Sequence, residues 1–351
     1  MLIGVPTEIK PLEGRVSMVP DAVAELVRAG HELLIQQGAG EASGYTDAQY
    51  QSAGGQIVDS AEAVYQASLV VKVKEPVAGD LALLRDDQLL FSYLHLAAEP
   101  ALSKKLCEIG LTAIGFETVQ LASGALPLLA PMSDIAGRLS VQIGTHLLHA
   151  PEGGKGILLG GLPGTPRGKV VILGAGTAGG NAAAMAAGIG AEVVVFDRNR
   201  DKLARMRALG DNVTGLHAYT DSIAEQVAQA DLLVGAVLVT GEKAPQLVSE
   251  EMVASMQAGS VILDISVDQG GCIATTRPTD YREPTYIKHG VVHFGVTNMP
   301  GAVPRTASQA LSAAIFPWIG RLAESNWRDS PELSAAVNVE AGKLVHPALQ
   351  A

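Results

Sequence analysis

The chain has 351 residues, of which 48% are hydrophobic, and it contains 39 glycines and two cysteines. This hydrophobic share supports a sizeable core and excludes global disorder, while no stretch reaches the ~18 unbroken apolar residues of a membrane span. The net charge of −11 argues against a nucleic-acid backbone as partner. The cysteine count excludes a disulfide framework and a cysteine-type metal site, and the N-terminus lacks a secretory-signal pattern, so we expect a cytoplasmic protein.

The first third of the sequence alternates short apolar runs with helix-like stretches. The expected strands cover residues 2–6, 32–35, 69–73, 89–94 and 113–116. The expected helices cover residues 21–29, 47–53, 60–66 and 100–108. This alternation is typical of a mostly parallel sheet covered by helices on both faces.

A helix start signal separates this part from a second alternating series. Ser133 and Asp134 follow two prolines, so we expect Ser133 to be the N-cap of a helix that reaches about His149. The strands expected after it cover residues 170–173, 192–196, 232–236, 261–265 and 291–296, and a late helix covers 306–323.

These elements predict an α/β protein with two doubly wound, Rossmann-like domains. One domain spans residues 128–305. The other is discontinuous and combines residues 1–127 with 306–351, because we expect the late helix to fold back onto the first part of the chain.

A glycine-rich turn is the strongest chemical signal. Three glycines in the pattern G-x-G-x-x-G follow the strand at 170–173, namely Gly174, Gly176 and Gly179. They permit a tight turn, approach of a pyrophosphate to the backbone, and close helix packing. Asp197 ends the next strand, where an acid binds the adenosine ribose and repels a 2′-phosphate, so NAD is favoured over NADP. Arg198 and Arg200 argue for NADP, since arginine can hold that phosphate.

Several charged residues of the first part are candidates for a substrate site. Arg15 has a guanidinium suited to a carboxylate, although it could be an ordinary loop charge. Lys72 and Lys74 alternate with valines and share one face, which could simply be exposed. His95 follows an apolar run and is a natural acid–base group, although a buried structural histidine fits equally well.

The second part offers two aspartates in one strand region. We place Asp264 inside the strand at 261–265 and Asp268 at its end, so Asp268 is the better catalytic acid, with a turn-capping role as the alternative. His146 and His149 have helical spacing but no further ligand, so we expect no metal site. Cys272 is more consistent with a small buried residue than with a nucleophile.

Many ordered motifs make the chain resemble the L-alanine dehydrogenase family over nearly its whole length. The most specific are VKVKEP at 71–76, YLHLA at 93–97, LPLLAPMSDIAGR at 126–138, LGAGTAG at 173–179, DISVDQGG at 264–271 and NMPGAVPRT at 298–306. The same superfamily contains the nucleotide-binding subunit of proton-pumping transhydrogenase. The segment 210–219 matches poorly, so we assign it no cofactor contact.

The resemblance implies a role for each matching residue. Arg15 and Lys74 would bind the substrate carboxylate, and His95 and Asp268 would be the acid–base pair. The cofactor would contact the glycine turn, Asp197 and Asp268 together with Ser133, Lys202, Val237, Leu238, Ile265, Asn298 and Met299. The family's subunits form hexamers, so a homohexamer is expected.

The activity implied is reversible NAD-dependent deamination of L-alanine to pyruvate and ammonia. Residues 1–127 with 306–351 would then be the substrate domain, and residues 128–305 the NAD-binding domain. Two alternatives stay open: a transhydrogenase nucleotide-binding subunit, and a non-catalytic NAD-binding protein. The presence of Arg15, Lys74, His95 and Asp268 together argues against the second alternative.

Overall fold

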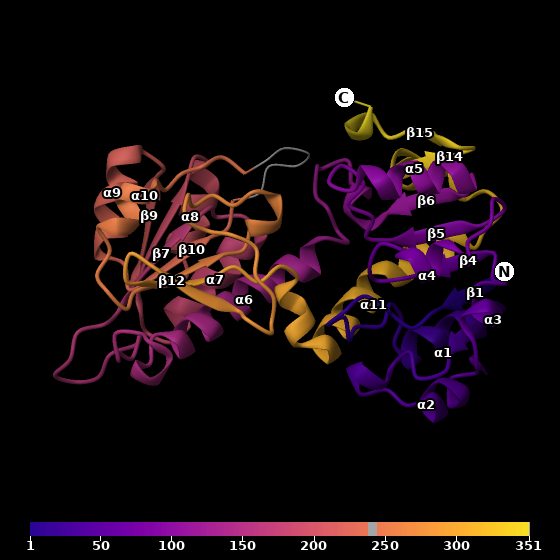
Figure 1. Cartoon of the computed structure of the whole chain (residues 1–351), viewed down its shortest axis with the longest axis horizontal. Coiled ribbons are helices and arrows are strands. Elements are labelled where there is room, and N and C mark those ends of the chain that lie inside the picture. Colours follow the sequence, from indigo (N-terminus) through magenta and orange to yellow (C-terminus); the bar gives the residue numbers. More distant parts are fainter. Residues whose placement is uncertain (238–243, 351) are drawn as a thin grey trace. The chain divides into compact units, whose positions relative to one another are not determined.

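A computed structural model describes residues 1–237 and 244–350 of the chain (Figure 1). The chain divides into two compact units. Unit 1 comprises Met1–Met132 with Gly301–Ala351, and unit 2 comprises Ser133–Pro300. The predicted α/β class with one discontinuous part is therefore confirmed. No helix in the described part is long and apolar enough to cross a bilayer.

Unit 1 has, within the described residues, an eight-stranded sheet in the order β15-β14-β6-β5-β4-β1-β2-β3. Its strands are β1 Leu2–Val5, β2 Glu32–Gln36, β3 Gln56–Val58, β4 Leu69–Val71, β5 Leu89–Ser92, β6 Thr112–Gly115, β14 Val337–Glu340 and β15 Lys343–Leu344. The first six are parallel, and β14 pairs antiparallel with β6. The end of the chain therefore extends the sheet that its beginning builds, as the yellow strands of Figure 1 show.

The helices of unit 1 include α11, which comes from the late part of the chain. They are α1 Pro20–Arg28, α2 Asp47–Ser52, α3 Ala61–Val64, α4 Ala78–Leu81, α5 Pro100–Ile109, α11 Pro304–Leu322 and α12 Pro331–Ala335. The hydroxyl oxygens of Ser308 and Ser312 on α11 accept hydrogen bonds from the N–H groups of Val16 (2.9 Å) and Val19 (3.1 Å). Helix α11 thus fixes the loop between β1 and α1.

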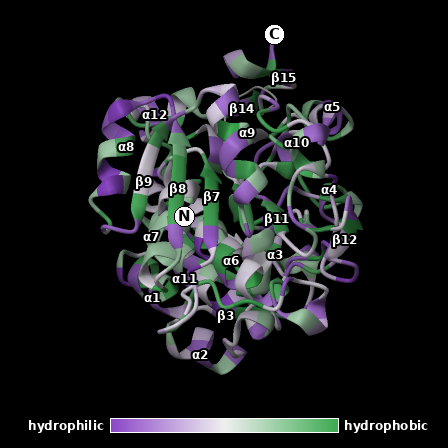
Figure 2. Cartoon of the chain, turned by 90° about the vertical axis from the view of Figure 1, so that its left-hand side faces the viewer, coloured by the Kyte–Doolittle hydropathy of each residue, from purple (hydrophilic) through white to green (hydrophobic). Residues whose placement is uncertain are grey.

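Unit 2 contains a seven-stranded sheet in its described part, in the order β12-β13-β11-β10-β7-β8-β9. Its strands are β7 Lys169–Leu173, β8 Glu192–Asp197, β9 Val213–His217, β10 Leu232–Gly235, β11 Val261–Asp264, β12 Thr285–Lys288 and β13 Val291–Phe294. The long apolar runs of β7 and β8 are visible in Figure 2 and are buried almost throughout, as expected for strands covered on both faces.

The helices of unit 2 include one that links the two units along the chain. They are α6 Ala130–Leu147, α7 Thr177–Gly188, α8 Arg200–Arg207, α9 Thr220–Gln229 and α10 Glu250–Ala254. The expected start of α6 at Ser133 is wrong, because the helix already begins at Ala130. Pro131 is compatible with that first turn, since the first N–H groups of a helix need no intrahelical acceptor. Ser133 therefore lies inside the helix.

Both sheets share one strand order. If the strands β1–β6 are numbered 1 to 6, unit 1 reads 3-2-1-4-5-6, and β7, β8, β9, β10, β11 and β13 repeat this order in unit 2. In such sheets the connections leave in opposite directions on either side of one strand pair, and ligands bind at the carboxyl ends there. The candidate positions are the ends of β1 and β4 in unit 1 and of β7 and β10 in unit 2.

The close packing of β1 gives a stability prediction. A Cβ added at Gly4 would lie 2.5 Å from the carbonyl oxygen of Val64 and 2.9 Å from Cβ of Ala67. We expect Gly4→Ala to destabilise the protein by about 1–3 kcal/mol and to lower its thermal midpoint. Gly320 on α11 is the matched control, because its Cβ would meet nothing within 4 Å. Gly320→Ala should stabilise by about 0.5–1 kcal/mol. Equal midpoints for the two variants would contradict this packing.

Candidate active site

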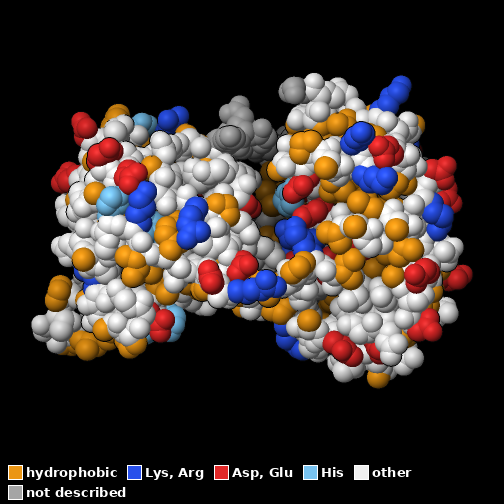
Figure 3. Space-filling view, in the orientation of Figure 1, with side chains coloured by type: hydrophobic (Ala, Val, Ile, Leu, Met, Phe, Trp, Pro, Cys, Tyr) orange, Lys and Arg blue, Asp and Glu red, His pale blue; other side chains and the backbone are white. Residues whose placement is uncertain are grey.

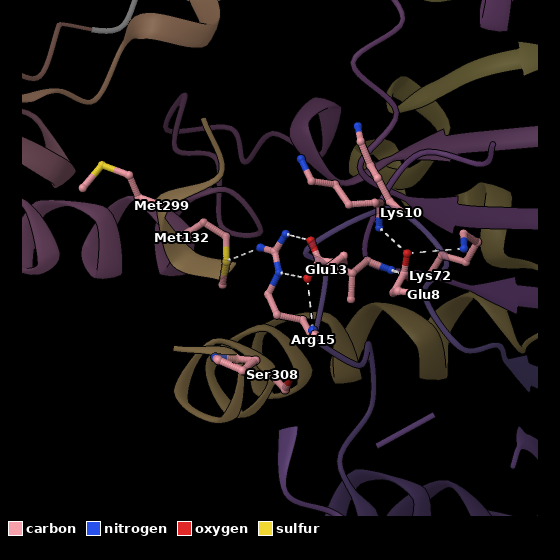
Figure 4. Close-up of polar contacts among 12 residues, drawn as sticks. Glu8, Lys10, Glu13, Arg15, Lys72, Met132, Met299 and Ser308 are labelled. Carbon is pink, nitrogen blue, oxygen red and sulfur yellow. Dashed lines mark hydrogen bonds and ion pairs between the residues drawn. The ribbon is translucent and has the colours of Figure 1, made fainter. Parts of the chain in front are cut away.

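Arg15 is buried in the loop after β1, with 3% of its surface exposed. Its Nε and Nη2 donate to the two carboxylate oxygens of Glu13 at 2.7 and 2.5 Å, and Nη1 lies 3.2 Å from Sδ of Met132 (Figure 4). The N–H of Val16, the residue after Arg15, donates a hydrogen bond to the hydroxyl of Ser308 on α11. An ordinary loop charge is therefore excluded, because Arg15 is a buried, anchored cation.

Lys72, directly after β4, is 1% exposed, so the alternative of an exposed lysine face is excluded for this residue. Its Nζ lies 3.3 Å from a carboxylate oxygen of Glu8 and 3.3 Å from one of Asp80. Glu8 also accepts a hydrogen bond of 2.6 Å from the N–H of Val73. Burial raises the pKa of the Glu8 carboxyl, while the charge of Lys72 opposes this. Sequence reasoning missed Glu8, although an acid just after a buried first strand was a usable signal.

Lys74 is half-buried beside this network and close to Arg15. Burial lowers the pKa of its ammonium group; the Glu75 carboxylate opposes this, and the charges of Arg15 and Lys10 add to the lowering. Lys10 is itself ion-paired with Glu75. Two cations held near each other at the carboxyl ends of β1 and β4 can bind a small anion such as a carboxylate.

His95 lies three residues after β5, which ends at Ser92 rather than at the expected residue 94. Its imidazole stacks on the ring of Tyr93 at a centroid distance of 5.9 Å and an interplanar angle of 7°. The hydroxyl of Tyr93 donates to the carbonyl of Leu128 at 2.6 Å. Tyr93 also interacts electrostatically with Arg15, whose charge counteracts part of the rise that burial causes in the pKa of Tyr93. Unit 1 thus brings Arg15, Lys74 and His95 into one neighbourhood.

The glycine turn of unit 2 has the geometry that a dinucleotide needs. Gly174 has φ +98°, and a Cβ at Gly179 would lie 1.8 Å from the carbonyl oxygen of Gly174. At Gly176, the N-cap of α7, a Cβ would meet nothing within 4 Å. The backbone is therefore open to a phosphate at the point where the helix N-terminus presents its N–H groups, so these residues fit the pyrophosphate of a dinucleotide.

Asp197 ends β8, as expected, and its carboxylate lies against the glycine turn. One oxygen accepts from the N–H of Ala175 and the other from the N–H of Asn199, both at 2.8 Å. Lys202 lies in the first turn of α8, where its N–H bonds to the side chain of Asn199 at 3.1 Å. The acid and the turn are therefore one connected structure.

The other expected cofactor residues of unit 2 lie close to strand ends or helix starts. Val237 follows β10, and its Cγ2 would be 3.4 Å from a Cβ at Gly174. Ile265 follows β11, and its N–H bonds to the carbonyl of Gly235 at 2.8 Å. Asn298 has φ +61°, and the buried Met299 begins the short 3-10 helix η5 Met299–Ala302. Leu238 lies outside the described residues.

The positions expected for Asp264 and Asp268 along β11 are both wrong, because the strand ends earlier than expected. Strand β11 ends at Asp264, and Asp268 lies beyond it in the 3-10 turn η4 Val267–Gln269, where it is exposed. The strand stops at Asp264 because its carboxylate binds the chain that follows. Among the described residues it accepts six hydrogen bonds from donors at the two ends of the Asp268 loop: from Ser266 N, Ser266 Oγ, Cys272 N, Ile273 N and Thr276 Oγ1 at 2.8–3.3 Å, and from Cys272 Sγ at 3.7 Å.

Two glycines make room for this carboxylate. A Cβ at Gly235 would lie 2.7 Å from Oδ1 of Asp264, and a Cβ at Gly271 would lie 2.9 Å from Oδ2. Cys272 is fully buried beside it, and burial together with the charge of Asp264 raises the pKa of the thiol. A nucleophilic thiolate at Cys272 is therefore disfavoured.

The described residues contain no cluster of three or more metal-ligating side chains. The Nε2 atom of His146 lies 3.6 Å from a carboxylate oxygen of Glu152, and both side chains are exposed. On the face shown in Figure 3, acidic and basic side chains are interspersed, and the visible described residues form no broad basic patch.

Comparisons with known proteins agree along the whole chain. The family described as "Alanine dehydrogenase/PNT, N-terminal domain" matches residues 4–136, and "Alanine dehydrogenase/PNT, C-terminal domain" matches residues 140–347. An alanine dehydrogenase of Geobacillus stearothermophilus is 48% identical over 100% of this chain and 96% of that protein. A solved L-alanine dehydrogenase has a TM-score of 0.97 at 50% identity, covering 100% of this chain and 98% of that one. A transhydrogenase of Sinorhizobium meliloti has a TM-score of 0.87 at 24% identity, covering 99% and 100%, which is a likeness of fold alone.

The saturated carboxylate of Asp264 gives a prediction. In Asp264→Asn an amide NH₂ replaces one oxygen, so it opposes N–H or O–H donors in either orientation. We expect a loss of about 1–3 kcal/mol, measured by urea unfolding followed by fluorescence. Asp211→Asn is the matched control, because it removes one negative charge at an exposed position of the same unit. Equal urea midpoints for the two variants would show that the Asp264 network is not needed for stability.

Proposed function

The chain belongs to the alanine dehydrogenase/PNT family, and from this premise we propose that it catalyses the reversible NAD-dependent oxidative deamination of L-alanine to pyruvate and ammonia. The observation that carries the proposal is the pair of adjacent cations, Arg15 and Lys74, at the carboxyl ends of β1 and β4. An enzyme that acts on an amino acid needs a carboxylate site of this kind, whereas transfer between two nucleotides does not.

A nicotinamide cofactor follows from the family and from the glycine turn of unit 2. We assign NAD rather than NADP because the carboxylate of Asp197 would hydrogen-bond the adenosine ribose hydroxyls and repel a 2′-phosphate. Further contacts are proposed for Ser133, Lys202, Val237, Leu238, Ile265, Asn298 and Met299. The chemistry that a bound nicotinamide supplies is acceptance of a hydride from Cα of the substrate.

The side chains of this protein bind the substrate and move its protons. Arg15 and Lys74 bind the carboxylate of L-alanine, and this fixes the orientation of Cα. Water then adds to the substrate imine, and ammonia leaves to give pyruvate. An imidazole nitrogen of His95 and a carboxylate oxygen of Asp268 take up and return the protons of these steps.

The remaining expectations complete the proposal. Residues 1–127 with 306–351 form the substrate domain and residues 128–305 the NAD-binding domain. The protein works in the cytoplasm as a homohexamer, with L-alanine, pyruvate and ammonia as its small-molecule partners.

The direct test is NADH formation by the purified protein with a panel of L-amino acids at alkaline pH. We expect the highest kcat/KM with L-alanine, and little turnover when NADP replaces NAD. His95→Ala and Asp268→Asn should each lower kcat by about 100-fold or more. If no amino acid reduces NAD while hydride exchange between two nucleotides proceeds, the transhydrogenase alternative holds. If the nucleotide binds without either reaction, the chain is a non-catalytic NAD-binding protein.

The role of Asp197 has its own test. Asp197→Ala removes charge-assisted hydrogen bonds to the ribose, so we expect KM for NAD to rise by about tenfold or more and the preference over NADP to fall. The second readout separates recognition from damage to the turn, because loss of structure weakens both cofactors alike. Asp201→Ala, an exposed acid in the first turn of α8, is the control. An unchanged NAD to NADP preference would remove Asp197 from this role.

A further inference from the structure

We propose that Glu117 is a positioning residue, whose carboxylate holds the main chain of His95 in a left-handed conformation and so fixes the place of its imidazole. The inference rests on the proposed function, because it assigns Glu117 to the proton transfers of His95. Glu117 is thereby connected to the reaction through the main chain and not through contact with substrate.

The main chain at His95 has φ +49°, a region that residues with a side chain rarely adopt because Cβ crowds the backbone carbonyl. Such conformations persist only where the surroundings enforce them, and they are concentrated at functional sites. The question for His95 is therefore which group enforces it.

The carboxylate of Glu117 binds the peptide groups at this point. The N–H of His95 donates to Oε1 of Glu117 at 2.6 Å, and the N–H of Leu94 donates to both oxygens at 3.1 and 3.2 Å. Two consecutive N–H groups aimed at one anion define the turn of the chain between them. Because the acceptor is charged, these are stronger than ordinary backbone hydrogen bonds.

Glu117 is itself held on both sides, in the 3-10 turn η2 Phe116–Thr118. Phe116 packs edge-on against Phe91 and Tyr93, with ring centroids 4.5 and 5.0 Å apart. The hydroxyl of Thr118 donates to the carbonyl of Ala336 at 3.0 Å and accepts from the amide of Asn338 on β14 at 2.8 Å. The carboxylate is thus presented from a rigid support that the late part of the chain completes.

The imidazole of His95 contrasts with its anchored backbone. It stacks on Tyr93, but it makes no hydrogen bond to any described residue. Glu117 therefore binds the main chain at His95, while both ring nitrogens stay available to substrate and water. A histidine with a purely structural role would be expected to use its ring polar atoms within the protein.

Glu117→Gln tests the proposal. The amide keeps the size of the side chain but loses the charge and presents NH₂ to one of the two N–H groups. We expect kcat for L-alanine to fall by about tenfold or more, with KM for L-alanine and NAD changed less than about threefold, because Arg15, Lys74 and the glycine turn remain intact. Active sites are counted by NADH binding, so misfolded protein cannot imitate a loss of kcat.

Two controls isolate the effect. Glu108→Gln removes an exposed carboxylate of α5 that pairs with Lys105. His346, in the C-terminal segment, interacts electrostatically with Glu117: burial lowers the pKa of His346, and the charge of Glu117 partly opposes this. The variant His346→Asn therefore removes a titratable neighbour of Glu117. Both should keep kcat within about twofold of the parent protein.

A structural readout keeps the proposal testable independently of activity. In the crystal structure of Glu117→Gln we expect φ of His95 to become negative. We also expect the rate at which diethyl pyrocarbonate acylates His95, measured against that of the exposed His146, to differ from the rate in the parent protein. If His95 keeps its left-handed φ, or if kcat stays within about twofold, the proposal is overturned. If the parent protein forms no NADH with L-alanine, the proposed function fails, and φ of His95 still decides the role of Glu117.

Discussion

In each mostly parallel sheet of this protein, one pair of neighbouring parallel strands sends its connections in opposite directions. At that pair the carboxyl ends are not crossed by a connection, so polar side chains and open backbone gather there without disturbing the helix layers. In unit 1 the pair is β1 and β4, and the buried charged side chains of Glu8, Arg15 and Lys72 follow these strands. In unit 2 the pair is β7 and β10, which are followed by the glycine turn and by Val237.

The charges of unit 1 are arranged so that one cation is less well compensated than the others. Arg15 has a bidentate carboxylate partner and Lys72 lies between two carboxylates. Removing one partner of such a buried pair costs about 3–5 kcal/mol, so these pairs form a rigid support. Lys74 lies beside them with a pKa that burial lowers. Under the proposed function, the carboxylate of L-alanine would restore the charge balance of Lys74.

The sequence was sufficient for features that depend on local chemistry. Steric necessity at Gly174 and Gly179 makes the glycine turn readable, and the acid that ends β8 follows from chain order. It was insufficient where tertiary contacts decide. The neighbouring sequence does not indicate that Lys72 is buried between acids from two other segments. It also does not indicate that β14 pairs with β6, from which more than two hundred residues separate it. Asp264 was expected inside the strand and Asp268 at its end, whereas β11 already ends at Asp264, because the donors of its carboxylate come from the chain beyond it.

Both proposed acid–base residues lie on chain segments whose peptide groups are bound by a neighbouring carboxylate. Glu117 binds the N–H groups of Leu94 and His95, and Asp264 binds those of Ser266 and Cys272, which flank Asp268. A carboxylate that receives backbone N–H groups is stabilised in its charged form by these hydrogen bonds. A left-handed residue costs about 1–3 kcal/mol, and one charge-assisted hydrogen bond contributes about 1.5–3 kcal/mol, so the contacts of Glu117 are of the size needed to offset the strain at His95. Because Glu117 anchors the main chain, the ring of His95 keeps its position without any hydrogen bond to the described residues. Proton transfer requires both a fixed position and an available ring nitrogen.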